Sequence, residues 1–203
     1  VGEFARLVAG ERKLAVSLTV VPLAGWERAL WYDETGLPWV NPSPNIRSVT
    51  QALLYAGVGL LEGTNLSVGR GTDRPFEIVG APWIDGDALA EALNRRRFAG
   101  VRFEPVSFMP TGDRYAREVC SGVRLHVTDR DAIRPVTVAL ALASALRERH
   151  RDQWKAESVQ NLLVNRSTMW AFLRGEPLER LLAWAEIERS SFLNRRASYL
   201  IYR

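Results

Sequence analysis

The chain contains 203 residues, of which 47% are hydrophobic, and it can bury a sizeable core as one compact domain without metals or disulfides. Its single cysteine, Cys120, excludes an internal disulfide, and no apolar stretch approaches the ~20 residues of a membrane span. The net charge of +4 rests almost entirely on arginine, because Lys13 and Lys155 are the only lysines. The arginine-rich patches are interspersed with acidic residues in helical patterns. That pattern is typical of solvated helix faces, so we expect no nucleic-acid partner.

The first third of the chain predicts helices around one strand. Gly2 to Arg12 has a helical pattern, and the β-branched run from Leu14 to Pro22 has strand character. A turn and a short helix are expected around Trp26 to Trp31. The apolar stretch from Arg47 to Leu61 predicts a buried helix that two glycines interrupt.

Strands and helices alternate along the rest of the chain. The sequence predicts a short strand over Pro75 to Val79, an amphipathic helix over Asp87 to Arg97, strands over Val101 to Met109 and Val123 to Thr128, a helix over Pro135 to His150, and helical segments from Ser158 to Tyr199 that break near Gly175 and Pro177. Asp85 or Asp87 is expected to cap the amphipathic helix. Together these elements predict an α+β fold, in which a mixed sheet is flanked by helices and followed by a helical C-terminal tail.

Between residues 41 and 83 the chain concentrates nearly all of its special-geometry residues. The clusters of turn formers read Asn41-Pro-Ser-Pro-Asn45, Glu62-Gly-Thr-Asn65, Ser67-Val-Gly-Arg-Gly-Thr72, Arg74-Pro-Phe76 and Gly80-Ala-Pro-Trp83. Prolines fix φ, glycines allow close approach of the backbone, and the polar side chains between them supply donors and acceptors. This combination predicts a rigid polar pocket built from loops, for a multi-hydroxyl ligand that carries negative charge.

These segments resemble the exo-β-N-acetylmuramidase family. Further parts of the resemblance are Pro38-Trp39, Gly2-Glu-Phe-Ala-Arg-Leu7, Thr19-Val-Val-Pro22 with Gly25-Trp26, Gly122-Val-Arg-Leu-His-Val-Thr-Asp129 and the closing Tyr199-Leu-Ile-Tyr202. The matches follow the order of the family along most of the chain and are weakest between about Arg151 and Glu176.

Members of that family remove terminal N-acetylmuramic acid from peptidoglycan fragments. The resemblance therefore implies a cofactor-free glycoside hydrolase of cell-wall turnover and muropeptide recycling, with a periplasmic or secreted location. It also implies that residues 1–203 form a single ancillary domain, the C-terminal half of a two-domain enzyme. The partner of this domain would be an N-terminal Rossmann-like domain that holds the catalytic glutamate. We expect that domain to lie outside this chain, which starts with Val1.

Glu62 stands where the apolar helix is predicted to end and the following turn begins. Its carboxylate can bind sugar hydroxyls, act as a catalytic acid or base, or only tie down backbone N–H groups of its loop. Glycosidases usually place two carboxylates around the scissile bond. Asp33, Glu34 and Asp73 have the context of ordinary turn residues, so no second candidate matches Glu62. This asymmetry favours chemistry in the other half of the enzyme.

Arg70 is the candidate for reading an anion, because Gly69 and Gly71 on either side allow a ligand to approach closely. The lactyl carboxylate of N-acetylmuramic acid suits the paired donors of a guanidinium. Arg74 is the second candidate, and the alternative role for Arg70 is a bridge between loop carbonyls. If Arg70 reads the carboxylate, Arg70→Lys weakens binding of muramic acid much more than binding of N-acetylglucosamine.

The other candidates are amides, hydroxyls and rings of the same loops. Asn41, Ser43 and Asn45 are substrate-binding candidates, although Asn45 or Ser43 can instead cap the following helix. Trp83 either stacks on a sugar ring or belongs to the core. Further substrate-binding candidates are Thr64, Asn65, Ser67 and Thr72.

The two histidines are too differently placed to form a recognisable metal site. His126 either orients Asp129, faces a domain interface or has a structural role, and Cys120 is expected to be a small buried residue. The alternative to the hydrolase is a non-catalytic carbohydrate-binding or partner-docking module that works on a separately encoded N-terminal subunit.

Overall fold

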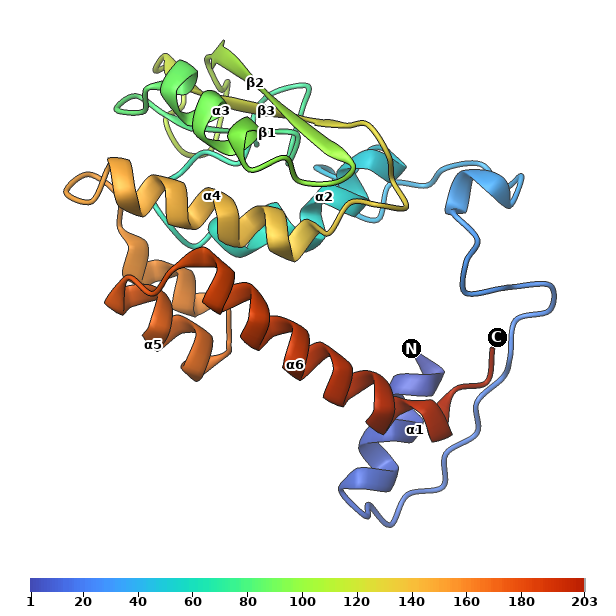
Figure 1. The fold of residues 1–203 in the computed structure, drawn as a ribbon. Helices are drawn as coiled ribbons and strands as arrows, with labels where there is room; N and C mark the ends of the chain where they lie inside the picture. Colours follow the sequence, from blue (N-terminus) through green and yellow to red (C-terminus); the bar gives the residue numbers. More distant parts are fainter. Residues whose placement is uncertain (203) are drawn as a thin grey trace. The chain divides into compact units, whose positions relative to one another are not determined.

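The three β-strands form one antiparallel sheet in the order β1-β3-β2 (Figure 1). They are β1 (Ile78–Ala81), β2 (Val101–Phe108) and β3 (Cys120–Val127). The computed structural model describes residues 1–202, and within them it confirms the α+β fold with a helical C-terminal tail. The sheet is antiparallel throughout rather than mixed. The reason is that β3 lies between β1 and β2, so the two strands that run in the same direction never pair.

The chain divides into two compact units. Unit 1 combines Val1–Pro38 with the segment that begins at Ala183, and unit 2 is Trp39–Leu182. The whole sheet and all the loop clusters between residues 41 and 83 belong to unit 2.

Three helices accompany the sheet in unit 2. They are α2 (Val49–Val58), which continues as the 3-10 turn η2 (Gly59–Leu61), α3 (Gly86–Arg95) and α4 (Pro135–Arg149). The α3 helix packs on β2 and β3, and α4 packs on α2 and α3 (Figure 1). At the contact between α2 and α4, a Cβ on Gly57 would come 2.0 Å from the carbonyl oxygen of Pro135. Gly57 therefore allows close helix packing and does not interrupt its helix.

The core of unit 2 lies among these helices and the sheet. Every residue of α4 from Val138 to Leu146 is buried. The largest fully buried side chains include Phe76, Leu54, Leu61, Leu66, Leu89, Leu93, Leu125, Leu142 and Leu146. Burial of so many apolar side chains gives this unit its main stabilising contribution.

Side-chain caps fix where the helices of unit 2 begin. Asp85 caps α3 by accepting a hydrogen bond from the Ala88 amide at 3.0 Å, as predicted for one of two aspartates. Ser48 caps α2, because its Oγ accepts a hydrogen bond from the Gln51 amide at 3.1 Å. The expectation that Ser43 or Asn45 caps this helix was wrong. The helix begins at Val49, and both residues lie too far from its first turn.

The C-terminal part of the chain is helical, as predicted. It contains η3 (Ala156–Asn161), α5 (Arg166–Arg174), α6 (Leu178–Arg196) and η4 (Ala197–Tyr199). The α5 helix ends at Gly175, whose φ of 80° lies in the left-handed region that favours glycine. The predicted break near this position is therefore confirmed.

Unit 1 contains α1 (Gly2–Glu11) and a 3-10 turn, η1 (Tyr32–Glu34). The strand predicted over Leu14–Pro22 was wrong, since this run pairs with no strand among residues 1–202. Its alternating side chains are suited to a sheet, but a strand also needs a neighbour for its backbone hydrogen bonds. The helix expected around Trp26 to Trp31 was also wrong, and only the turn η1 follows it. No helix in the described part of the chain is long and apolar enough to cross a membrane.

Candidate functional site

Glu62 and Arg70 form an ion pair where the α2–η2 helix ends. Glu62 is the C-cap of η2, and the Arg70 Nε donates a hydrogen bond to its Oε1. The Arg70 guanidinium also lies 5.3 Å from the ring centroid of Phe76, a completely buried residue. Arg70 therefore contacts a carboxylate and an aromatic ring. The alternative prediction, that it bridges loop carbonyls, finds no such hydrogen bond among the described residues.

A second carboxylate, which the sequence analysis missed, joins this pair. The Asp113 Oδ2 lies 3.8 Å from the Arg70 Nε. Asp113 belongs to the β2–β3 loop, residues 109–119. The available signal was the cluster Pro110-Thr-Gly-Asp113, which is typical of a turn. Its position beside Arg70 depends on how the hairpin docks, which local sequence does not reveal.

The β2–β3 loop docks on the loop that carries Arg70. The Thr111 amide and its Oγ1 both donate hydrogen bonds to the Gly71 carbonyl oxygen, at 2.8 and 2.9 Å. A Cβ on Gly71 would lie 2.3 Å from the Gly112 carbonyl oxygen, and its φ is +76°. Gly71 was expected to let a ligand approach closely. In the structure it is instead the protein's own backbone that approaches.

Three residues of the β2–β3 loop adopt left-handed backbone conformations that are unusual for residues with a Cβ. The φ values of Asp113, Tyr115 and Arg117 are 66°, 59° and 66°. Such conformations persist only where surrounding contacts hold them. Here the Arg117 amide donates to the Pro110 carbonyl oxygen at 2.8 Å, in addition to the contacts at Gly71.

Tyr115 joins two of the predicted site residues. Its hydroxyl donates a hydrogen bond to the Asn65 carbonyl oxygen at 2.8 Å and accepts one from the Trp83 Nε1 at 3.2 Å. Trp83 is half-buried and its ring packs edge-on against His150, at 5.4 Å between centroids. The β2–β3 loop therefore fixes the indole of Trp83 as well as the carboxylate of Asp113.

A small notch opens at the charged residues. It has a volume of about 50 Å³ and is lined by Glu62, Leu66, Ser67, Val68, Arg70, Asp113 and Arg114. We call Glu62, Arg70, Asp113 and Arg114 the charged cluster. A space of this size has room for a small polar group.

Four of the predicted binding residues use their side chains to build the loops. The Thr64 and Thr72 hydroxyls donate to the Leu61 and Gly69 carbonyl oxygens at 2.7 and 2.6 Å. Ser67 is buried, and its Oγ accepts a hydrogen bond from the Gly69 amide at 3.3 Å. The Asn65 amide group donates to the Gln153 carbonyl oxygen and accepts from the Lys155 amide, both at 2.8 Å. These contacts make the loops rigid around the notch.

The residues before α2 make local contacts. Asn41 accepts a hydrogen bond from the Trp39 Nε1 at 2.9 Å, and the Ser43 Oγ accepts one from the Asn45 amide at 3.4 Å. Asn41 is exposed and Asn45 is half-buried. The structure does not place any of the three in the lining of the notch.

Arg74, the second anion-reading candidate, also lies outside the lining of the notch. Its guanidinium forms ion pairs with Glu77 at 3.4 Å and with Asp73 at 3.9 Å. Glu77 in turn accepts a hydrogen bond from the Gln51 Nε2 at 3.0 Å. Arg74 thus belongs to a separate polar group beside the loop.

His126 and Cys120 lie outside the lining of the notch. His126 contacts the Glu104 carboxylate across the β2–β3 pair, and this hydrogen bond lowers the pKa of Glu104; His126 does not orient Asp129. Burial raises the pKa of the Cys120 thiol to about 11, and the residue is fully buried as predicted. Among residues 1–202, no group of three or more His, Cys, Asp or Glu side chains could hold a metal ion.

Comparison with known proteins identifies the family of this chain. Residues 53–202 match the C-terminal model of the exo-β-N-acetylmuramidase NamZ, and residues 1–50 match its N-terminal model. The chain belongs to the exo-β-N-acetylmuramidase NamZ family. The match to the N-terminal model covers α1, the unpaired run after it and η1, all of which lie in unit 1.

The relatives that this chain matches are longer than the chain itself. It is 36% identical over 205 residues to the peptidoglycan β-N-acetylmuramidase NamZ of Bacillus subtilis (strain 168), covering all of this chain and 50% of that protein. A DUF1343 family protein from Bacteroides fragilis NCTC 9343 superposes with a TM-score of 0.89 at 25% identity, covering 56% of its chain. A second protein of that family and organism superposes with a TM-score of 0.71 at 24% identity, covering 55%. The chain thus spans about half the length of the relatives it matches.

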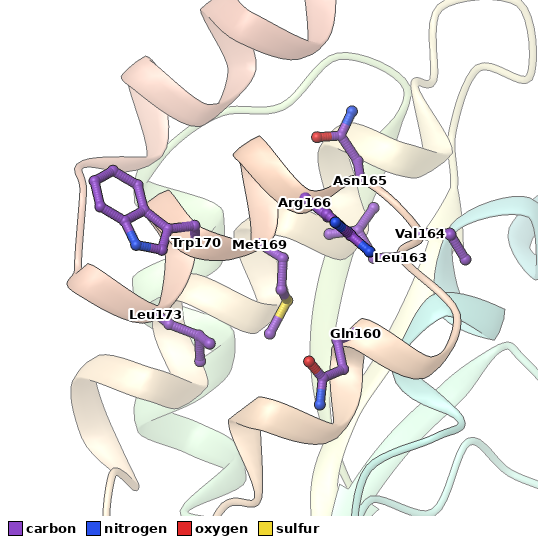
Figure 2. Close-up of a pocket in the computed structure, with 8 residues that line it drawn as sticks. All are labelled: Gln160, Leu163, Val164, Asn165, Arg166, Met169, Trp170 and Leu173. Atoms are coloured by element: carbon purple, nitrogen blue, oxygen red, sulfur yellow. The ribbon is translucent and has the colours of Figure 1, made fainter.

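A larger hollow lies beside α5, within the residues that match the C-terminal family model (Figure 2). Its volume is about 340 Å³, and it is lined by Gln160, Leu163, Val164, Asn165, Arg166, Met169, Trp170 and Leu173. Figure 2 shows the Met169 side chain extending from α5 toward the space between Leu173 and Gln160. Trp170 is 60% exposed, and the Arg174 guanidinium lies 4.5 Å from the centroid of its ring. This hollow is mainly apolar and contains no carboxylate, unlike the notch.

Proposed function

We propose that this chain is the substrate-recognition part of an exo-β-N-acetylmuramidase, a glycoside hydrolase that removes terminal N-acetylmuramic acid from peptidoglycan fragments. Membership of the NamZ family supports this reaction. The single structural observation that supports the recognition role is the charged cluster, held by hydrogen-bonded loops around a small notch. The lactyl carboxylate distinguishes N-acetylmuramic acid from N-acetylglucosamine, and a site for a small anion suits that difference.

We propose further that the chemistry belongs to the remaining part of a two-domain enzyme, a Rossmann-like domain. Glycoside hydrolysis usually needs the scissile bond to lie between two carboxyl groups. Glu62 and Asp113 both face the Nε of Arg70, so this guanidinium fills the space where the two carboxylates approach each other. Such a pair is suited to holding an arginine rather than to exchanging protons with a substrate. The chain would then form one wall of a cleft, with the catalytic glutamate on the opposite wall.

The decisive measurement is release of chromophore from a chromogenic β-N-acetylmuramide by the 203-residue chain alone, beside the matching N-acetylglucosaminide. We expect no turnover of either compound by the folded chain. We also expect ligand-observed NMR to detect binding of N-acetylmuramic acid. A fusion of this chain to the N-terminal half of the Bacillus subtilis relative should turn over the muramide selectively.

Two results would contradict the proposal in different ways. Turnover by the isolated chain that Glu62→Gln abolishes would place the catalyst in this chain. Failure of the folded chain to bind either sugar would favour the alternative, a partner-docking module without a sugar site.

A further inference from the structure

The charged cluster contains one guanidinium without a partner. The Arg70 Nε faces both Glu62 and Asp113. The Oδ1 of Asp113 accepts a hydrogen bond from the Arg114 backbone amide at 2.7 Å. Arg114 is exposed and lines the notch, and no hydrogen bond or ion pair engages its guanidinium within the described part of the chain. All charged groups of the notch are therefore paired except the side chain of Arg114.

The net charge around each guanidinium also distinguishes Arg70 from Arg114. Two carboxylates lie within 4.0 Å of the Arg70 Nε, so Arg70 and its partners together carry a net negative charge. An anion bound to Arg70 alone would be repelled by both carboxylates at close range. With Arg114 included, the four charges of the notch balance, and the guanidinium of Arg114 is the one of the two that has no carboxylate partner among the described residues.

We propose that Arg114 reads the lactyl carboxylate of N-acetylmuramic acid and that Arg70 is a positioning residue, which holds Glu62 and Asp113 in place. This inference rests on the proposed function, because it assigns the acidic sugar to the same site. A planar guanidinium binds a carboxylate through two parallel hydrogen bonds. The notch that Arg114 lines is small, and this suits a small anionic group of the sugar.

The β2–β3 loop fixes the backbone of Arg114 beside the notch. Arg114 lies between two residues with left-handed backbone, Asp113 and Tyr115. Asp113 is placed beside Arg70, and Tyr115 is hydrogen-bonded to Asn65 and Trp83. Both neighbours are therefore tied to the loops of the site. A backbone held in this way reduces the entropy that the loop loses when a ligand binds.

The test compares two ligands and three variants of the 203-residue chain. The ligands are N-acetylmuramic acid and its lactyl methyl ester, which has the same sugar but no charge on the lactyl group. The variants are Arg114→Gln, Arg114→Lys and the control Arg117→Gln, which removes the same charge from the same loop but lies outside the notch. Dissociation constants are measured by NMR titration, and circular dichroism checks that each variant is folded.

We expect Arg114→Gln to weaken binding of the acid by about tenfold or more, as for the loss of a charge-assisted hydrogen bond. Binding of the ester should change by less than about twofold, and Arg117→Gln should leave both ligands within the same range. Arg114→Lys should recover part of the affinity, because it keeps the charge but loses the paired geometry.

Equal effects of Arg114→Gln and Arg117→Gln on the acid would overturn the assignment of Arg114. Equal affinity of the unmodified chain for acid and ester would also overturn it, and would leave the sugar-recognition role intact. If the unmodified chain bound neither ligand, the proposed function itself would fail.

Discussion

Unit 2 and unit 1 are stabilised in different ways. Unit 2 buries α4, the sheet and the loops around Phe76 in one apolar core. In unit 1, Leu7 is the only hydrophobic side chain among the described residues that is buried, while Leu14, Val16 and Leu18 are all exposed. A hollow of about 170 Å³ among Phe4, Leu7, Phe192 and Leu200 adds to this loose packing.

Polar anchors take the place of a core in unit 1. The Arg28 guanidinium pairs with Glu3 at 2.8 Å, and Arg195 pairs with Glu11 at 2.5 Å. The ring of Trp26 packs edge-on against Tyr202, at 4.5 Å between centroids. Exposed ion pairs contribute little to stability. Unit 2 is therefore stabilised mainly by burial of apolar side chains, whereas unit 1 depends mainly on polar and aromatic contacts near its surface.

Truncating a core side chain should give the largest difference between the units. Leu142→Ala removes a completely buried side chain from α4 and should lower the free energy of unfolding by about 2–5 kcal/mol. The matched change in unit 1, Leu18→Ala, should cost less than about 0.5 kcal/mol, because that side chain is 43% exposed. Urea unfolding followed by circular dichroism measures both values. Comparable losses would show that unit 1 is packed as tightly as unit 2.

Removing the Tyr115 hydroxyl should weaken the attachment of the β2–β3 loop to Asn65 and Trp83 and leave the apolar core unchanged. Tyr115→Phe deletes the bonds to Asn65 and Trp83 and should cost about 1–2 kcal/mol of unfolding free energy. The control is Tyr55→Phe, since the Tyr55 hydroxyl makes no hydrogen bond among the described residues. Urea unfolding of both variants gives the difference. A Tyr115→Phe protein as stable as the Tyr55→Phe control would mean that the β2–β3 loop does not depend on this bridge.

The smallest effect is expected from a change at Glu3, whose carboxylate holds the amides of Ile201 and Tyr202 in unit 1. Glu3 accepts hydrogen bonds from Arg28 and from the amides of Ile201 and Tyr202, and these bonds lower its pKa to about 2. A carboxyl group with a lowered pKa stabilises the fold above its ordinary pKa of 4.5, and this contribution is lost as the pH falls toward 2. Glu3→Gln should therefore speed hydrogen exchange at the amides of Ile201 and Tyr202 at neutral pH.

The matched control for this anchor is Glu27→Gln, a nearby acidic residue with no side-chain partner among the described residues. It should leave the exchange of both amides unchanged. Lowering the pH of the unmodified protein from 5 toward 2 should reproduce the Glu3→Gln effect after correction for intrinsic exchange. If the two amides exchanged equally fast in the unmodified protein and in the Glu3→Gln variant, the carboxylate would not anchor the tail.

The sequence by itself determined the elements whose signals are local. The amphipathic pattern and Asp85 predicted α3 and its cap, and Gly175 predicted where α5 ends. The density of turn formers between residues 41 and 83 predicted where the loops of the site lie, and it singled out Glu62 and Arg70, which the structure brings together. These features depend on residues within a few positions of one another, so periodicity and turn chemistry report them.

Only the tertiary structure decided the features that depend on distant residues. Asp113 and Arg114 reach the site because the β2–β3 pairing and the contact of Thr111 with Gly71 bring a hairpin loop onto it. The residues from Leu14 to Pro22 have a strand pattern but no partner strand, and a strand is stable only when a neighbour accepts and donates its backbone hydrogen bonds. A local pattern can state which face of a segment prefers burial. Which other segment lies against that face is decided by the packing of the whole chain.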